Sequence, residues 1–117
     1  MLCLVKIVYK NATALVMPTY FGPTNIPPLD AWDNELPVIY SYHLSEQTDD
    51  AAIYVDPNSS EDLADQIEKM LNKEFRQELI KKGSIKLSDI KKKREDAINT
   101  LLNKFNEYEK IQKNWKI

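Results

Sequence analysis

The fold class follows from residues 14–41, ALVMPTYFGPTNIPPLDAWDNELPVIYS. A short apolar run opens this segment at residues 14–17, a second closes it at residues 37–41, and a proline borders each. Such runs are typical of strands that are buried on both faces of a parallel sheet. Residues 27–34 predict a short helix, because proline is tolerated in a first helical turn, where its missing N–H has no partner anyway. Strand, helix and strand in this order predict a βαβ unit of an α/β fold.

The second half of the chain extends this α/β pattern with helices. Residues 51–55 form a third apolar run, and no proline follows Pro57. Ser59, with Asp62 three positions later, predicts the start of a helix through a capping box. Apolar residues recur at helical spacing from Leu63 to Leu71, which continues this helix. Residues 75–80 predict a second helix that Gly83 terminates in a left-handed cap, and a long final helix follows.

The amino-terminal segment and the size of the sheet leave questions open. Residues 2–9 fit a strand and a helix equally well. Three short parallel strands make a poor sheet, because parallel sheets are normally larger and covered on both faces. We therefore expect a partial Rossmann-like lobe, the last part of a larger α/β domain, whose other strands are missing or come from a partner.

Length and composition predict a single domain. The chain has 117 residues, of which 43% are hydrophobic, and a formal charge of −2. Within it we expect a lobe over residues 1–90 and a C-terminal amphipathic helix of the same domain over residues 91–117. The near-neutral charge lacks the basic footprint of a nucleic-acid-binding protein. With one cysteine, Cys3, no signal-peptide pattern and no apolar run of membrane-spanning length, we expect a cytoplasmic protein.

The loop at residues 18–26 carries the chemistry that the sequence suggests. It is expected at the carboxyl edge of the sheet, where open α/β folds bind ligands. Gly22 lets a backbone approach a ligand closely, and the amides of Asn25 and Ile26, at the positive end of the next helix, can hold a diphosphate. Asp30 can accept hydrogen bonds from a vicinal diol such as ribose. A nucleotide site is one interpretation; a plain surface loop is the other, because no glycine-rich phosphate fingerprint is present.

Four motifs stand in a characteristic order and spacing. They are the segment from Pro18-Thr19 to Ala31, Leu36-Pro-Val-Ile39, Asp50-Ala-Ala-Ile-Tyr-Val-Asp-Pro57 and Glu61-Asp-Leu-Ala64. Together they resemble the C-terminal, donor-binding half of family 4 glycosyltransferases, also called group 1 glycosyl transferases. That family consists of retaining, metal-independent enzymes of the GT-B fold. The resemblance covers about residues 4 to 88 and implies a truncated member of this family.

The resemblance implies a set of donor-binding residues. Two carboxylates eight positions apart mark the family, and the second, which binds ribose, falls on Asp30 as a shorter replacement for Glu. The first, which contacts the donor sugar, falls on Gly22. We expect Gly22, Thr24, Asn25 and Ile26 on the diphosphate side and Asp30 on the ribose, with no catalytic residue, metal ligand or cofactor in this chain.

The resemblance also implies an enzymatic function in polysaccharide biosynthesis. A nucleotide-diphosphate sugar would donate its sugar to a glycan acceptor that is held by an N-terminal domain this chain lacks. The basic residues that neutralise the departing diphosphate lie upstream in the family and have no match here. We therefore expect a chain that is inactive alone, with no nucleic-acid partner; the resemblance leaves room for peripheral membrane association of the intact enzyme. The alternative is a non-enzymatic α/β remnant that binds a protein partner through its C-terminal helix.

Two other features of the sequence have simpler interpretations. His43 is the only histidine, and with no nucleophile or second ligand beside it we expect a surface or packing residue. The basic run at residues 91–94 is expected to be a solvated turn of helix. The apolar stripe at residues 98–115 is expected to pack against another part of the intact protein.

Overall fold

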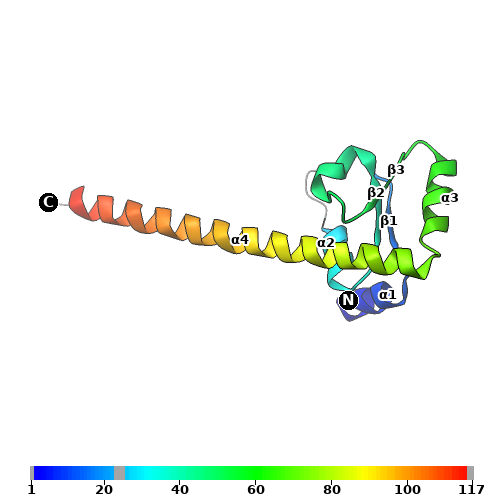
Figure 1. Cartoon of the computed structure of the whole chain (residues 1–117). Helices are drawn as coiled ribbons and strands as arrows, with labels where there is room; N and C mark the ends of the chain where they lie inside the picture. The colour runs from blue at the N-terminus through cyan, green and yellow to red at the C-terminus, as the bar shows by residue number, and fades with distance from the viewer. Residues whose placement is uncertain (1, 23–25, 116–117) are drawn as a thin grey trace. The chain divides into compact units, whose positions relative to one another are not determined.

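The computed structural model describes residues 2–22 and 26–115, with side chains from residue 4 onward. Along the chain, its elements are α1 (Leu2–Asn11), β1 (Leu15–Met17), α2 (Pro27–Asp33), β2 (Val38–Ser41), the 3-10 helix η1 (Tyr42–Gln47), β3 (Ile53–Val55), α3 (Ser60–Lys69) and α4 (Lys73–Trp115) (Figure 1). The three predicted strands and the α/β class are confirmed. The chain divides into two compact units, Met1–Leu87 and Ser88–Ile117.

The sheet of the first unit has the strand order β1-β2-β3, and both pairs are parallel. Leu15 lies opposite Val38, and Ile39 lies opposite Ile53. Every residue of β2 is buried, whereas β1 and β3 are partly exposed. Burial on both faces is therefore confirmed for the central strand, whereas β1 and β3, at the two edges of the sheet, are only partly buried.

Helices cover the sheet and complete its core. The α2 helix contacts β1 and β2, and α3 contacts β3. A core cluster joins Ile39 and Val55 of the sheet to Met70, at the end of α3, and to Leu79 of α4. Burying each such side chain contributes about 1.5–3 kcal/mol, so the first turns of α4 belong to the core of the first unit.

One helix settles an open alternative, and another differs from the sequence expectation. The ambiguous opening segment forms the helix α1. The α4 helix continues through Gly83, so the predicted left-handed cap at this residue is wrong. A Cβ atom at Gly83 would lie 2.3 Å from Cδ1 of Trp32. The glycine is thus explained by the close approach of an indole ring and not by a helix end.

The start of α3 at Ser59 is as predicted, but only the first half of the capping box is formed, because the Ser59 N–H donates to the Asp56 carbonyl. The Ser59 Oγ accepts a hydrogen bond from the backbone N–H of Asp62, at 3.1 Å. The Asp62 carboxylate in turn accepts a 2.8 Å hydrogen bond from the backbone N–H of Asp56. The cap therefore also connects α3 to Asp56, the residue directly after β3.

Candidate functional site

Gly22 is fixed to the central strand through a side-chain relay. The buried Tyr40 of β2 donates its hydroxyl to Gln47 Oε1, at 2.8 Å. The amide of Gln47 donates to the carbonyl oxygen of Gly22. Since Gln47 ends η1, which directly follows β2, this relay holds the buried Gly22 near the carboxyl end of β2.

Three aromatic rings gather at the same edge of the sheet. The ring of His43 lies 4.0 Å from that of Tyr42 and 5.9 Å from that of Tyr20, measured between centroids. All three residues are exposed, and the Tyr20 hydroxyl donates to the side chain of Asn58. Exposed aromatic faces of this kind are surfaces on which a nucleobase can stack. His43 is thus a surface residue in contact with other rings, as expected.

Two hydroxyls are buried beside this aromatic group. The Oγ atom of Ser41 and the Oγ1 atom of Thr19 are inaccessible to solvent and have no hydrogen-bond partner in the part of the chain that the structure describes. Ser41 ends β2, and Thr19 follows β1, in which Met17 lies opposite Tyr40. Both hydroxyls therefore lie at the carboxyl edge. An unsatisfied buried polar group costs about 1–3 kcal/mol, so a polar ligand that reached either hydroxyl would be favoured.

The amino-terminal end of α2 has few amide donors of its own for a phosphate group. Ile26 is the N-cap residue, and its carbonyl accepts hydrogen bonds from the amides of Leu29, at 2.9 Å, and Asp30, at 3.2 Å. Pro27 and Pro28 have no N–H to donate. The first two residues of α2 therefore add no amide donor to the predicted contact at Ile26. Thr24 and Asn25 themselves lie outside the described residues.

Asp30 lies on the exposed surface of α2, near α1. Burial raises the pKa of the Tyr9 phenol, and the negative charge of Asp30 adds to this rise. The two predicted residues thus have different neighbours. Gly22 contacts Gln47, whereas the Asp30 carboxylate lies close enough to Tyr9 to raise the pKa of its phenol. A ligand that used both residues would have to reach from one set of neighbours to the other.

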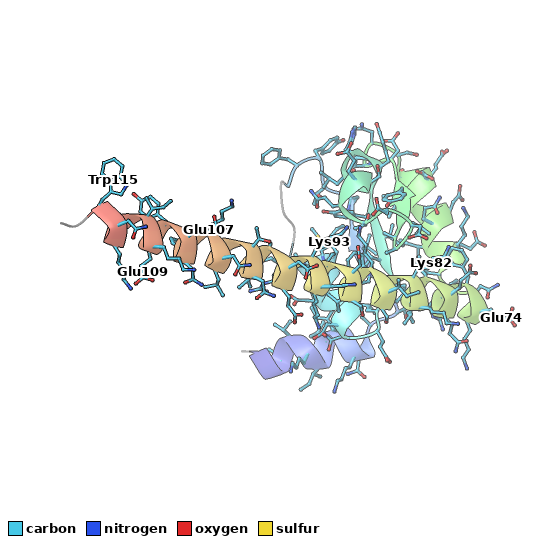
Figure 2. All side chains as sticks on the ribbon, turned by 60° about the vertical axis from the view of Figure 1, so that its left-hand side comes forward. Glu74, Lys82, Lys93, Glu107, Glu109 and Trp115 are labelled. Atoms are coloured by element: carbon cyan, nitrogen blue, oxygen red, sulfur yellow. The ribbon has the colours of Figure 1, made fainter. Side chains whose placement is uncertain are left out.

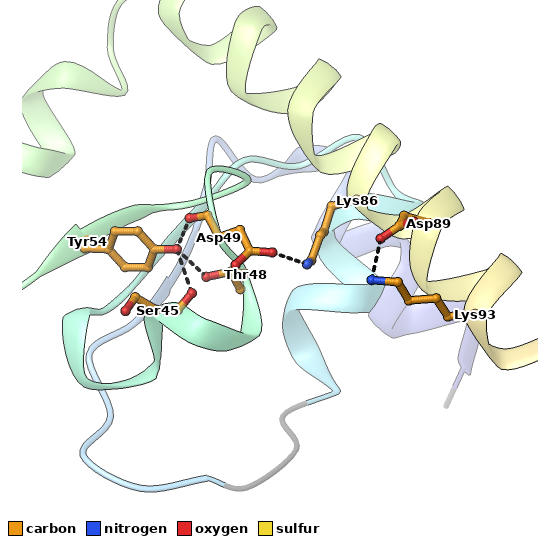
Figure 3. A network of polar contacts seen from close by, with 7 residues as sticks. All are labelled: Ser45, Thr48, Asp49, Tyr54, Lys86, Asp89 and Lys93. Atoms are coloured by element: carbon orange, nitrogen blue, oxygen red, sulfur yellow. Dashed lines mark hydrogen bonds and ion pairs between the residues drawn. The ribbon is translucent and has the colours of Figure 1, made fainter. Parts of the chain in front are cut away.

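A second polar network lies between β3 and η1, and it has a structural role. The Tyr54 hydroxyl bonds to Thr48 Oγ1, at 2.7 Å, and donates to the carbonyl oxygens of Ser45 and Asp49 (Figure 3). Burial raises the pKa of Tyr54, and the Asp49 carboxylate raises it further, while the Thr48 hydrogen bond opposes the rise. Asp49 also pairs with Lys86 of α4. These contacts hold the turn between η1 and β3 in place.

A cavity of about 280 Å³ adjoins this network but suits a diphosphate poorly. Asp49, Asp50 and Glu78 line it, with one base, Lys82. Three carboxylates repel a phosphate group, because like charges in a partly buried space are weakly screened. The carboxyl edge of β1 and β2 is therefore the better candidate site.

The sequence interpretation missed four residues of this edge. They are Thr19, Tyr20, Ser41 and Tyr42. The available signal was their position, since each pair stands where an apolar run ends and the carboxyl ends of parallel strands meet at one edge. Their residue types alone carried no such signal, because hydroxyls and aromatic rings are common on any protein surface.

The described residues show neither a metal site nor a helix that could span a membrane. Within residues 2–22 and 26–115, no group of three or more His, Cys, Asp or Glu residues is arranged to hold a metal ion. Over the same described ranges, none of the helices combines the length and apolar character needed to cross a membrane. No protein-family model, curated protein or solved structure matches the chain.

Proposed function

We propose that this chain is the donor-binding part of a retaining, metal-independent glycosyltransferase of the GT-B type, which binds a nucleotide-diphosphate sugar and is inactive alone. One observation carries the proposal: exposed aromatic rings lie beside Ser41 at the carboxyl end of β2, and the buried hydroxyl of Ser41 has no hydrogen-bond partner among the described residues. Aromatic faces stack on nucleobases, and an unsatisfied hydroxyl favours a polar ligand. The ordered motifs that resemble family 4 glycosyltransferases support the same interpretation.

In this proposal each part of the donor has its own contact. The base stacks on Tyr42 and His43, and the ribose hydroxyls donate to the exposed carboxylate of Asp30. The diphosphate meets the loop through Gly22, Thr24, Asn25 and Ile26. The backbone approaches the ligand closely at Gly22, where no side chain stands in the way.

Transfer of the sugar requires groups from outside this chain. Stabilising the charge of the departing diphosphate is usually the largest electrostatic contribution to such a reaction. The only bases before residue 61 are Lys6 and Lys10, and both lie on α1. In addition, α1 exposes apolar residues, namely Leu4, Val5, Ile7 and Val8. These features support the proposal that other strands and an acceptor-binding domain complete the lobe, and that this chain binds the donor without turning it over.

Calorimetric titration with UDP, GDP and ADP tests donor binding directly. We expect one of these nucleotides to bind the full chain in the millimolar range. Asp30→Ala should weaken that binding at least about tenfold, because it removes the hydrogen bonds between the ribose hydroxyls and the charged carboxylate. The matched control is Asp33→Ala, which removes another exposed carboxylate of α2. Binding of none of the nucleotides, or an equal loss in both variants, would contradict the proposal.

A second candidate function is protein interaction through the C-terminal helix. The observation that favours it is the exposure of all residues from 91 to 115. Seven of them are large and apolar: Ile98, Leu101, Leu102, Phe105, Tyr108, Ile111 and Trp115. An exposed apolar stripe of this size is typical of a surface that binds a partner.

A further inference from the structure

We propose that residues 98–115 of α4 form a parallel, in-register coiled coil with a second copy of this chain. This inference is independent of donor binding and concerns only the second unit, Ser88–Ile117. Three features of this segment carry it: the heptad phase of its apolar residues, the form of the hollows between them, and the charges that flank them.

The apolar residues follow a heptad repeat. With Ile98 at position a, the next a positions are Phe105 and Gln112, and the d positions are Leu101, Tyr108 and Trp115. The large apolar residues among these are between 48% and 82% exposed, and Figure 2 shows Trp115 at the far end of the helix. A repeat of 3.5 residues keeps the a and d positions directed at a partner helix, and we call the stripe of these positions the seam. Gln112 supplies the single polar a residue that typically sets the register of such pairs.

Two hollows on this surface repeat at an interval of seven residues. The first is lined by Leu101, Lys104, Phe105 and Tyr108; the second is lined by Tyr108, Ile111, Gln112 and Trp115. Each contains heptad positions d, g, a and d in this order. In a coiled coil, a seam side chain of one helix inserts into a hole formed by four residues of the facing helix. Phe105 and Gln112 of a second copy would occupy these two holes.

The charges beside the seam select a second copy in parallel orientation. Lys104 stands at position g and Glu109 at the following e position. In a parallel pair, g of one helix faces the next e of the other, so Lys104 meets Glu109 of the second copy twice by symmetry. In an antiparallel pair with the same seam aligned, Lys104 would face Ile111 and Glu109 would face Leu102, so neither charge would gain an opposite partner. The existing partners within the helix, Glu107 at 3.7 Å and Lys113 at 3.4 Å, are exposed, and such pairs contribute little.

The basic run sets the amino-terminal limit of the seam. One heptad before Ile98, the a and d positions are Lys91 and Arg94. Two copies would place these like charges close together, which disfavours pairing there. The seam is therefore shorter than three heptads, and we expect modest affinity.

Sedimentation equilibrium of the full chain, from micromolar to several hundred micromolar, tests self-association. We expect a reversible monomer–dimer equilibrium. Phe105→Glu should weaken it by more than about a hundredfold, because a charge would enter a seam position. The matched control is Asn103→Glu at the outward position f, which should change the dissociation constant by less than about threefold. A monomer at every concentration, or equal effects of the two variants, would overturn the proposal.

Charge exchange tests the orientation without altering the seam. Lys104→Glu and Glu109→Lys should each weaken dimerisation about tenfold, since two attractive pairs become repulsive. The double variant should restore the wild-type dissociation constant. Equimolar mixing of the two single variants should restore dimerisation as well. A double variant as weak as either single variant would overturn the parallel register.

Discussion

At the scale of single residues, the contact between Trp32 and Gly83 shows how one position can have opposite local and tertiary requirements. A glycine inside a helix is about 0.5–1 kcal/mol less favourable than alanine. Gly83 nevertheless stands inside α4, because the indole of Trp32 occupies the space that a Cβ atom would need. Packing of the first unit therefore outweighs helix propensity at this position.

Gly83→Ala is accordingly expected to destabilise the protein. The gain in helix propensity is about 1 kcal/mol, whereas forcing a methyl group into a packed contact typically costs about 1–3 kcal/mol. We expect a net loss of up to about 2 kcal/mol in the free energy of unfolding, measured by urea denaturation. Ser84→Ala, at the adjacent exposed position, should cause no loss. Equal or greater stability of Gly83→Ala would contradict the close contact with Trp32.

At the scale of elements, the two short helices beside the sheet begin differently. The α2 helix starts with two prolines and has no side-chain cap, so few of its first amides can donate to a ligand. The α3 helix starts with Ser59 as a side-chain cap and with acidic residues in its first turn. Negative charge at this end is favourable, because it interacts with the helix dipole. The start of α3 is thus stabilised by its own side chains, whereas the start of α2 lacks a side-chain cap and adjoins the proposed donor loop.

The start of α3 should make stability depend on pH. The backbone hydrogen bond from Asp56, followed by the side-chain hydrogen bond from Gln66, holds the pKa of Asp62 below its ordinary value of 3.8. This stabilisation is complete above the ordinary value and is lost as the pH falls through the lowered pKa. Asp62→Asn should therefore reduce the loss of stability on acidification below about pH 4.

Urea denaturation between neutral pH and about pH 3 measures this effect. Asp65→Asn is the matched control, since Asp65 is an exposed residue of the same helix, and it should leave the acid-induced loss unchanged. An unchanged pH dependence in Asp62→Asn would show that the Asp56 and Gln66 contacts do not stabilise the carboxylate.

At the scale of the whole molecule, the division into two compact units separates two proposed properties. The first unit contains the sheet, its core and the candidate donor site, and the second contains the heptad seam. The last core residue that α4 contributes is Leu79, and Gly83 contacts Trp32 soon after. Both lie before the boundary at Leu87.

Truncation after Leu87 should therefore leave a folded first unit. We expect cooperative thermal unfolding, followed by circular dichroism, with a midpoint close to that of the full chain, because the core contacts are retained. The truncated chain should remain monomeric at concentrations where the full chain dimerises. Loss of cooperative unfolding would show that the first unit depends on residues 88–117.

Much of the fold could be predicted because its signals are local. Apolar runs bordered by proline marked the three strands, and the serine cap marked the start of α3. Less of the candidate site could be predicted. The loop was identified as the place of interest, but the relay from Tyr40 through Gln47 to Gly22 joins residues far apart in the sequence. No spacing rule connects such residues.

By itself, the sequence determined the order and type of most elements and the heptad phase of the last helix, because hydrophobic periodicity and proline act within a few residues. Only the tertiary structure decided that the opening segment is a helix, that α4 continues through Gly83, and that aromatic rings and buried hydroxyls share the carboxyl edge of the sheet. These outcomes depend on which distant side chains come into contact. Such contacts can outweigh a local preference of about 1 kcal/mol at any single residue.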